Sequence, residues 1–310
     1  MTTPSTWNLA RLRHAHRMRK GSNSTELASD VSGLTPGHIL NRPSIWRAGI
    51  IFASPHSGNV YPESFVQNSQ LDISQLRRNE DMFIDKLFAP AFIAGAPLLS
   101  AQFPRCFVDV NRASDELPQE WSDTPTEPSA RTQAGIGVIP THINDALPIY
   151  TQDLTKAEAQ ARLTHLYHPY HKALRGIIDE ALDAFGQALL IDCHSMPGFG
   201  PMGARRPDII LGDKFGQSCH PATLTMIKSL FQKSGYSVVI NHPYAGGFVT
   251  SHYGRPSTGI EAIQIEINRD LYLNSVTFTP KRGYEKLAND IKHIITQIIQ
   301  TASSQSIAAQ

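Results

Sequence analysis

The sequence contains only three cysteines in 310 residues, and they lie far apart. Cys106, Cys193 and Cys219 form no CxxC pair and are odd in number, so no disulfide framework is predicted. Scarce cysteine without pairing is typical of proteins in a reducing compartment. We therefore expect a cytoplasmic protein.

Long apolar runs, a strong net charge and phosphate-binding glycine motifs are also missing. No apolar run approaches the ~20 residues of a membrane helix, and no apolar region follows the basic first ~25 residues, as it would in a secretory signal. A net charge of +1 gives no electrostatic reason to expect a nucleic-acid or membrane partner. Without a Walker A or GxGxxG motif, nucleotide binding is not predicted either.

Apolar segments of strand length alternate with amphipathic segments along most of the chain. This pattern predicts an α/β fold with a mixed, mostly parallel sheet and helices on both faces. We expect a single domain over residues 41–300. A polar N-terminal extension over residues 1–40 and a frayed tail over residues 301–310 would flank it.

Four of the segments predicted as strands end in polar side chains. The carboxyl ends of parallel strands meet at one edge of a sheet, where ligands bind, so these side chains are expected to share a pocket. They are His56 in "GIIFASPHSG", Asp109, Asn111 and Arg112 in "CFVDVNR", Asp192 and His194 in "LLIDCHSMPG", and Glu266, Asn268 and Arg269 in "IQIEINR".

Each of these residues also has a structural interpretation. His56 would cap the following turn, Asp192 and His194 would form a hydrogen-bonded pair, and Glu266 would face solvent from an edge strand. The two arginines would form structural salt bridges. Four such ends in one chain favour a functional site over four separate coincidences.

The chemistry of this set is that of a metal-dependent hydrolase. Two imidazoles and one carboxylate make a three-ligand zinc site with an open position, and zinc activates water and polarises a carbonyl. A second carboxylate transfers the proton, and an arginine grips a substrate carboxylate with two hydrogen bonds. The residues therefore predict hydrolysis of an amide whose substrate bears carboxylates.

Seven motifs together resemble the N-formylglutamate amidohydrolases, also called N-formylglutamate deformylases. They are "SPHSGNVYP", "NEDMFIDKLF", "FVDVNR", "IDCHSMP", "PDIILGD", "GGFVTSHYGRP" and "IQIEINRDLY", in family order over about residues 45–290. The resemblance implies a fold similar to zinc carboxypeptidases and succinylglutamate desuccinylases. It also implies hydrolysis of N-formyl-L-glutamate to formate and L-glutamate, a late step of histidine breakdown.

The resemblance implies one Zn²⁺, or another divalent ion, held by His56 and His194. Related carboxypeptidases take a glutamate three residues after the first histidine, where this chain has Asn59. The acidic ligand must then come from "NEDMF", with Asp81 favoured and Glu80 as the fallback. Gly58 is expected to allow the tight turn that presents the first histidine.

Further roles follow from the same resemblance. Glu266 occupies the place of the general base, with Asp192 as the next candidate. Asn111 and Arg112 resemble the pair that grips a substrate carboxylate. The second carboxylate of the substrate is expected to bind to Arg255 and Arg269, together with Asn268.

Two other hypotheses remain open at this point. A carboxypeptidase-like enzyme for a peptide or cell-wall fragment would need an open cleft, and the long loop over residues 113–150 decides this. The other is a metal-binding or ligand-binding protein that has lost catalysis, and the intact Glu266 and Arg112 argue against it. A serine hydrolase is disfavoured, because Ser57 and Ser195 lie in no GxSxG motif. The oligomeric state is left open.

Overall fold

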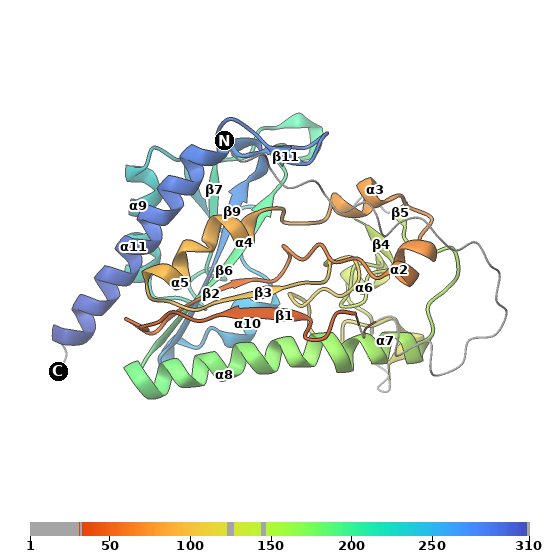
Figure 1. Cartoon of the computed structure of the whole chain (residues 1–310), viewed down its shortest axis with the longest axis horizontal. Coiled ribbons are helices and arrows are strands. Elements are labelled where there is room, and N and C mark those ends of the chain that lie inside the picture. The colour runs from red at the N-terminus through yellow and green to blue at the C-terminus, as the bar shows by residue number, and fades with distance from the viewer. Residues whose placement is uncertain (1–30, 32, 123–126, 144–146, 309–310) are drawn as a thin grey trace.

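A seven-stranded sheet forms the centre of the computed structural model, which describes residue 31 and residues 33–122, 127–143 and 147–308 (Figure 1). The basic N-terminal arm expected from the sequence lies outside the described residues. Across the sheet the strands are β1 (His38–Asn41), β3 (Leu98–Ala101), β2 (Ile50–Ser54), β6 (Ala188–Met196), β9 (Ile260–Asn268), β7 (Ile209–Gly212) and β8 (Val238–Ile240).

The middle of this sheet is parallel, and its two sides contain antiparallel pairs. β3, β2, β6 and β9 run in the same direction, while β1 is antiparallel to β3 and β7 is antiparallel to β9. The predicted mixed, mostly parallel sheet is therefore confirmed. The carboxyl ends of β2, β6 and β9 share one edge, and the carboxyl end of β7 lies at the opposite edge.

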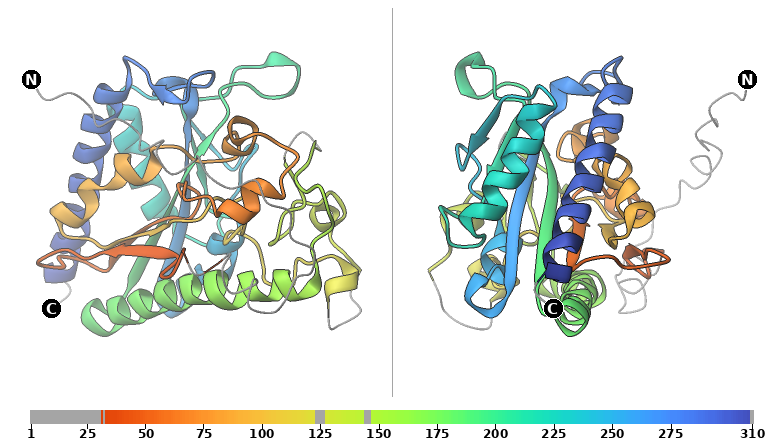
Figure 2. Two further views of the ribbon diagram at one scale, coloured as in Figure 1. Left: turned by 45° about the vertical axis from the view of Figure 1, so that its right-hand side comes forward. Right: turned by 90° about the vertical axis from the view of Figure 1, so that its left-hand side faces the viewer.

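Helices cover both faces of the sheet, as predicted (Figure 2). In β2, Ile51 and Ala53 pack into one core while Ile50 and Phe52 pack into the other, because successive strand residues point to opposite faces. The first core includes residues of α7 (Lys156–Arg162), α8 (His168–Phe185) and α10 (Phe248–Tyr253). The second includes residues of α4 (Ile84–Phe88), α5 (Pro90–Ala94), α9 (Pro221–Lys233) and α11 (Tyr284–Ala308).

The long helical region that contains Pro169 is divided by an irregular turn. α7 begins at a capping box formed by Thr155 and Glu158, and a π-helical turn, η3 (Leu163–Tyr167), joins it to α8. Proline lacks the N–H of a regular helical hydrogen bond, which accounts for the irregular turn directly before it. α8 ends at Gly186, whose φ of 69° suits glycine.

Several short elements complete the chain. They are the helices α2 (Glu63–Gln67), α3 (Ile73–Arg77) and α6 (Ala130–Gln133), the 3₁₀ turns η2 (Gln119–Trp121), η4 (Pro201–Gly203), η5 (Pro256–Thr258) and η6 (Arg269–Leu271), and the hairpin strands β4 (His142–Ile143), β5 (Leu147–Pro148), β10 (Leu273–Asn274) and β11 (Thr279–Pro280). No helix within the described ranges is both long and apolar enough to cross a membrane.

One predicted strand is absent, and one helical segment is broken into short pieces. Residues 70–95 contain three short helices and no continuous one, because Phe83 takes a left-handed conformation before α4 and Pro90 starts α5. Residues 105–112 are not a strand but a series of turns, in which the Phe107 and Val108 amides bond back to the Pro104 carbonyl. Asn111 and Arg112 therefore reach the sheet edge from a loop.

The ordered fold also extends past both expected domain boundaries. β1 begins at His38, within the expected extension, because it pairs with β3, and Val31 and Leu34 are buried before it. At the other end α11 continues to Ala308, so residues 301–308 form a helix where a frayed tail was expected.

Gly58 is required by a close approach of two backbones. A Cβ atom at this position would lie 2.1 Å from the Phe103 carbonyl oxygen and 2.5 Å from the Gln102 carbonyl carbon. The φ of Gly58 is not positive, so glycine is needed here for space and not for an unusual backbone angle. The segment after β2 therefore packs directly against the chain that follows β3.

We predict that Gly58→Ala destabilises the protein by about 1–3 kcal/mol, because overpacked backbone must shift. Gly176 provides the matched control, since it lies within α8 with nothing within 4 Å of a Cβ atom. Gly176→Ala should stabilise the protein by up to about 1 kcal/mol. Urea unfolding of both variants measures the difference, and equal stabilities would contradict the steric argument.

Candidate metal centre

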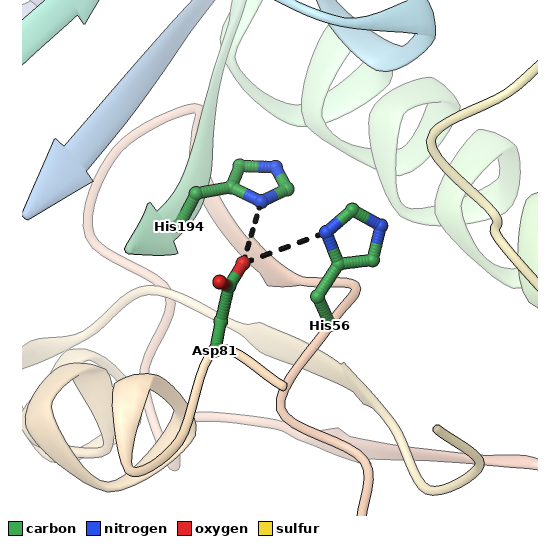
Figure 3. Close-up of side chains that lie close together, drawn as sticks. All are labelled: His56, Asp81 and His194. Carbon is green, nitrogen blue, oxygen red and sulfur yellow. Dashed lines mark hydrogen bonds and ion pairs between the residues drawn. The ribbon is translucent and has the colours of Figure 1, made fainter. Parts of the chain in front are cut away.

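Three buried side chains meet at the carboxyl edge of the central strands (Figure 3). His56 lies in the turn after β2, His194 lies in β6, and Asp81 lies in the loop before α4. Asp81 Oδ2 is 2.9 Å from His194 Nδ1 and 3.4 Å from His56 Nδ1. One ligand atom from each residue lies within 4.8 Å of the others. The structure thus brings together the three residues predicted as ligands.

Glu80, the fallback ligand, points away from this group. Its carboxylate accepts a 2.6 Å hydrogen bond from the Tyr61 hydroxyl and forms an ion pair with Arg77, whose Nε lies 3.1 Å from Glu80 Oε1. The geometry therefore favours Asp81 over Glu80 as the acidic member.

The far nitrogen of each imidazole is held by its own carboxylate. His56 Nε2 lies 2.7 Å from Asp109 Oδ1, and His194 Nε2 lies 2.9 Å from Asp192 Oδ2. When a ring donates from Nε2 to its carboxylate, its Nδ1 lone pair is free for a metal ion. Both Nδ1 atoms then face the Asp81 carboxylate. Two metal-ligating histidines would be oriented in this way.

The second oxygen of Asp81 is fixed by the protein itself. Asp81 Oδ1 accepts hydrogen bonds of 2.9 Å from Arg269 Nη2 and from Ser195 Oγ. The Asp81 amide also donates to the His56 carbonyl at 2.9 Å. One oxygen is thereby anchored while the other is directed at the two imidazoles.

The surrounding charges keep two buried carboxylates ionised. Burial alone would raise the pKa of Asp81, but the adjoining His194 and His56 side chains and the charge of Arg269 outweigh it and hold the pKa well below its usual value. Burial would likewise raise the pKa of Asp109, but the charge of Arg105 lowers it well below the usual value. Both groups are therefore available as anions at neutral pH.

The donor set fits a divalent metal ion. His56 Nδ1 is buried without a hydrogen-bond partner among the described residues, which is costly unless another group occupies its lone pair. Two imidazole nitrogens and one carboxylate oxygen, each with a bonded outer partner, are the ligands that Zn²⁺ prefers. The residues present are thus consistent with such an ion.

Glu266 lies beside this group on β9. It is the register partner of His194 on β6, and Gln264 Nε2 donates a 2.7 Å hydrogen bond to its Oε1. Burial raises the pKa of Glu266 to about 7. A carboxyl with a pKa near the working pH can both accept and return a proton.

Sequence reasoning missed Arg105, which lies close to the same group. Its Nη2 is 2.7 Å from Asp109 Oδ2, and its charge also interacts with Asp81 and Glu266. The sequence pattern pointed to the polar residues at the end of the predicted strand "CFVDVNR", and Arg105 lies before this strand. The turns over residues 105–112 place the arginine at the site.

The family profile of N-formylglutamate amidohydrolases matches residues 48–273. This chain belongs to that family. The matched range contains all the residues of the metal centre. The match confirms the family resemblance that the sequence motifs indicated.

Individual relatives agree with this assignment. N-formylglutamate deformylases of Pseudomonas putida and Pseudomonas aeruginosa are 28% and 29% identical to this chain, and each alignment covers 82% of this chain and 92% of the relative. The crystal structure of N-formylglutamate amidohydrolase from Ralstonia eutropha superposes with a TM-score of 0.81 at 31% identity, covering 86% of this chain and 98% of that one. An Agrobacterium tumefaciens protein at 17% identity, with a TM-score of 0.63, shares the fold.

Asn111 and Arg112, which were predicted to bind a substrate carboxylate, are only partly free to bind a ligand. The Asn111 amide donates to Asp192 Oδ2 at 3.3 Å and accepts from the Val249 amide at 2.8 Å, so it supports the site instead of facing a ligand. Arg112 bonds the Ile136 and Asn111 carbonyls through Nε and Nη1. Its Nη2 has no partner in the described part of the chain.

Arg105 and Arg112 line the same small pocket of about 20 Å³, together with Asn79 and His142. Arg105 takes part in the Asp109 ion pair, and Arg112 retains a free nitrogen. Two cations at one pocket make it a candidate position for a substrate anion.

The three residues predicted for a second carboxylate are placed differently. Arg269 uses all three guanidinium nitrogens on Ser195, Arg78 and Asp81. Asn268 is fully buried, and its amide donates to two backbone carbonyls. Arg255 pairs with Ile260 at the amino end of β9, which is the wrong end of the strand. The structure therefore brings neither Arg255 nor a free Arg269 to the site.

We predict that Asp81→Asn loses most of the bound metal while Glu80→Gln retains it. Asparagine removes the charge directed at the two imidazoles, whereas glutamine at position 80 still accepts the Tyr61 hydrogen bond. Metal per chain, measured by mass spectrometry after dialysis against zinc, distinguishes the two variants. Metal loss in Glu80→Gln with retention in Asp81→Asn would reverse the assignment.

Proposed function

We propose that this chain is a zinc-dependent amidohydrolase that cleaves N-formyl-L-glutamate, or a similar small N-acyl acidic amino acid, to formate and L-glutamate. The observation that carries the proposal is a buried His56–Asp81–His194 donor group with Glu266 beside it as a separate carboxyl group. The names of the family and of its relatives support the substrate.

His56, Asp81 and His194 would hold the ion. Zn²⁺ is proposed because its preferred ligands are nitrogen and oxygen donors of this kind. When bound, it supplies Lewis-acid chemistry that activates water and polarises a carbonyl.

Glu266 acts as the proton carrier of the reaction. It takes a proton from the water that attacks the formyl carbon, and it delivers that proton to the nitrogen as the C–N bond breaks. Its pKa of about 7 suits both transfers. The products are formate and the free amino group of glutamate, so the atoms of one water are divided between them.

Arg105 and Arg112 supply positive charge on one side of the reacting group. Negative charge develops on the formyl oxygen during attack, and the charge of Arg105 already interacts with Asp81 and Glu266. Arg112 binds the α-carboxylate of the substrate through its free nitrogen in the pocket that both arginines line.

A metallohydrolase for a peptide or cell-wall fragment is the second candidate. It is favoured by a cavity of about 610 Å³ within residues 118–154, which shares His142 with the small pocket of the two arginines. Release of formate from N-formylglutamate, compared with cleavage of a γ-glutamyl peptide, decides between the two.

We propose a cytoplasmic enzyme of histidine degradation whose partner is a small carboxylate-bearing molecule, not a nucleic acid or a membrane. The near-neutral net charge of +1 supports this choice of partner.

We predict that Glu266→Gln lowers turnover by roughly 10²–10⁴ without loss of zinc, because glutamine cannot carry the proton. Glu261→Gln is the matched control, since Glu261 lies on the same strand at its amino end and bonds the His220 amide. Formate release and metal content are measured for both variants. Near-normal turnover in Glu266→Gln would transfer the role of base to another group, with Asp192 next.

We also predict that Arg112→Lys lowers kcat/KM by about 1.5–3 kcal/mol, because lysine keeps the charge but cannot make the two carbonyl bonds that direct Nη2 of Arg112. Zinc content should not change. The comparison substrate is N-formylglutamate with an amidated α-carboxylate, which the variant should hydrolyse almost as well as the free acid. An unchanged preference for the free acid would show that Arg112 does not bind this carboxylate.

A further inference from the structure

A substrate with two carboxylates leaves one of them without a partner among the residues discussed so far. This step rests on the proposed function, in which the substrate is a dianion. Arg112 is available for the α-carboxylate, whereas Arg269 is fully used on Asp81, Ser195 and Arg78. A second cation must lie elsewhere around Glu266.

Arg206 lies beside the carboxyl end of β9. β7 is antiparallel to β9, with Ile210 opposite Glu266, and the Asn268 amide bonds the Asp208 carbonyl at 2.9 Å, which extends the pairing. Residues 206–208 directly precede β7, whose amino end lies beside the carboxyl end of β9. Arg206 therefore reaches the carboxyl edge of β9 from the β7 side.

The backbone around Arg206 is held by hydrogen bonds from the Asn268 side chain and to Gly198. Asn268 Nδ2 donates to the Arg206 and Pro207 carbonyls at 3.2 Å each, and the Arg206 amide donates to the Gly198 carbonyl at 2.9 Å. Asn268, predicted to contact substrate, instead fixes the chain that carries this arginine.

The Arg206 side chain keeps free hydrogen-bond donors. Its Nη1 donates to the Pro197 carbonyl at 2.9 Å, while Nε and Nη2 have no partner within the ranges that the structure describes. The guanidinium carbon lies 5.4 Å from the centre of the Tyr244 ring. Stacking on an aromatic ring orients a guanidinium without using its donors.

Tyr244 contacts Arg206 through its ring and lies in a segment that continues to Asn111 beside the metal centre. Its chain segment, residues 242–247, ends where Gly247 packs on the Asn111 amide. Burial raises the pKa of Tyr244, and the charges of Arg206, Glu266, Arg269 and Asp81 all act on the phenol. The hydroxyl makes no hydrogen bond to any described residue, so it remains a free donor.

We propose that Arg206 and Tyr244 bind the side-chain carboxylate of the substrate and set its preference for an acidic side chain. Two guanidinium donors and one hydroxyl suit the two oxygens of a carboxylate. The strand order β2–β6–β9–β7 puts this pair on the side of Glu266 opposite to Asp109 and its arginines. The scissile amide would lie between the two anion positions.

The test compares N-formyl-L-glutamate with N-formyl-L-glutamine, which keeps the α-carboxylate but has a neutral side chain of similar shape. Arg206→Gln in the zinc-loaded full chain should lower kcat/KM for the glutamate substrate roughly 10- to 100-fold, as expected for lost charged hydrogen bonds. The glutamine substrate should change little, and zinc content should stay constant. Tyr244→Phe should give a smaller loss in the same direction.

Arg205→Gln is the matched control, because Arg205 adjoins Arg206, is 67% exposed and lies 3.8 Å from Asp208. It should behave as the unmodified protein. Equal losses on both substrates in Arg206→Gln, or an undiminished preference for the glutamate substrate, would overturn the proposal.

A binding measurement separates this inference from the proposed function. If the unmodified protein releases formate from neither substrate, the proposed reaction is wrong. Calorimetry with L-glutamate and L-glutamine then still tests the carboxylate site. Tighter binding of glutamate, lost in Arg206→Gln, would support the site, and equal binding of the two amino acids would overturn it.

Discussion

The shared Asp81 carboxylate is the interaction on which the rest of the site depends. Its Oδ2 faces the Nδ1 atoms of His56 and His194, and its Oδ1 is bonded by Arg269 and Ser195. One side chain thereby joins the turn after β2, the loop before α4, and the ends of β6 and β9. Because these segments are far apart in sequence, the site exists only when the central parallel strands have assembled.

The charges around Asp81 explain why a cation belongs there. Three buried carboxylates, Asp81, Asp109 and Asp192, lie with Glu266 beside the cations Arg105, Arg112 and Arg269. Counted as ionised beside neutral imidazoles, these four carboxylates exceed the three arginines by one negative charge. Unpaired buried charge is costly, and a divalent ion would neutralise it. The outer carboxylates then serve to orient the imidazoles and do not compete as ligands.

Sequence patterns predicted the parts of the site that follow from local strand structure, and they failed where tertiary pairing decides. The histidines and Glu266 lie at or just beyond the ends of apolar strands, and Asp81 came from the family motif. Whether Arg269 is free depends on its pairing with Asp81, which no local pattern contains. Arg206 was missed because β7 runs antiparallel to β9, so its amino end, not its carboxyl end, reaches the site.

Strand order also limits the size of the substrate that the proposed arrangement suits. Neighbouring strands lie about 4.8 Å apart, so β2 and β7, three positions apart in the sheet, are separated by roughly 14 Å. The proposed anion positions flank His194 and Glu266 within about this width. Only four bonds separate the two carboxylate carbons of glutamate, so the long Arg112 and Arg206 side chains must converge from the two sides for a short dianion to contact both. A longer peptide would have to leave the sheet edge and would gain from only one of the two cationic positions. Two cations that converge on one amide thus suit a small acidic N-acyl amino acid better than a polymer.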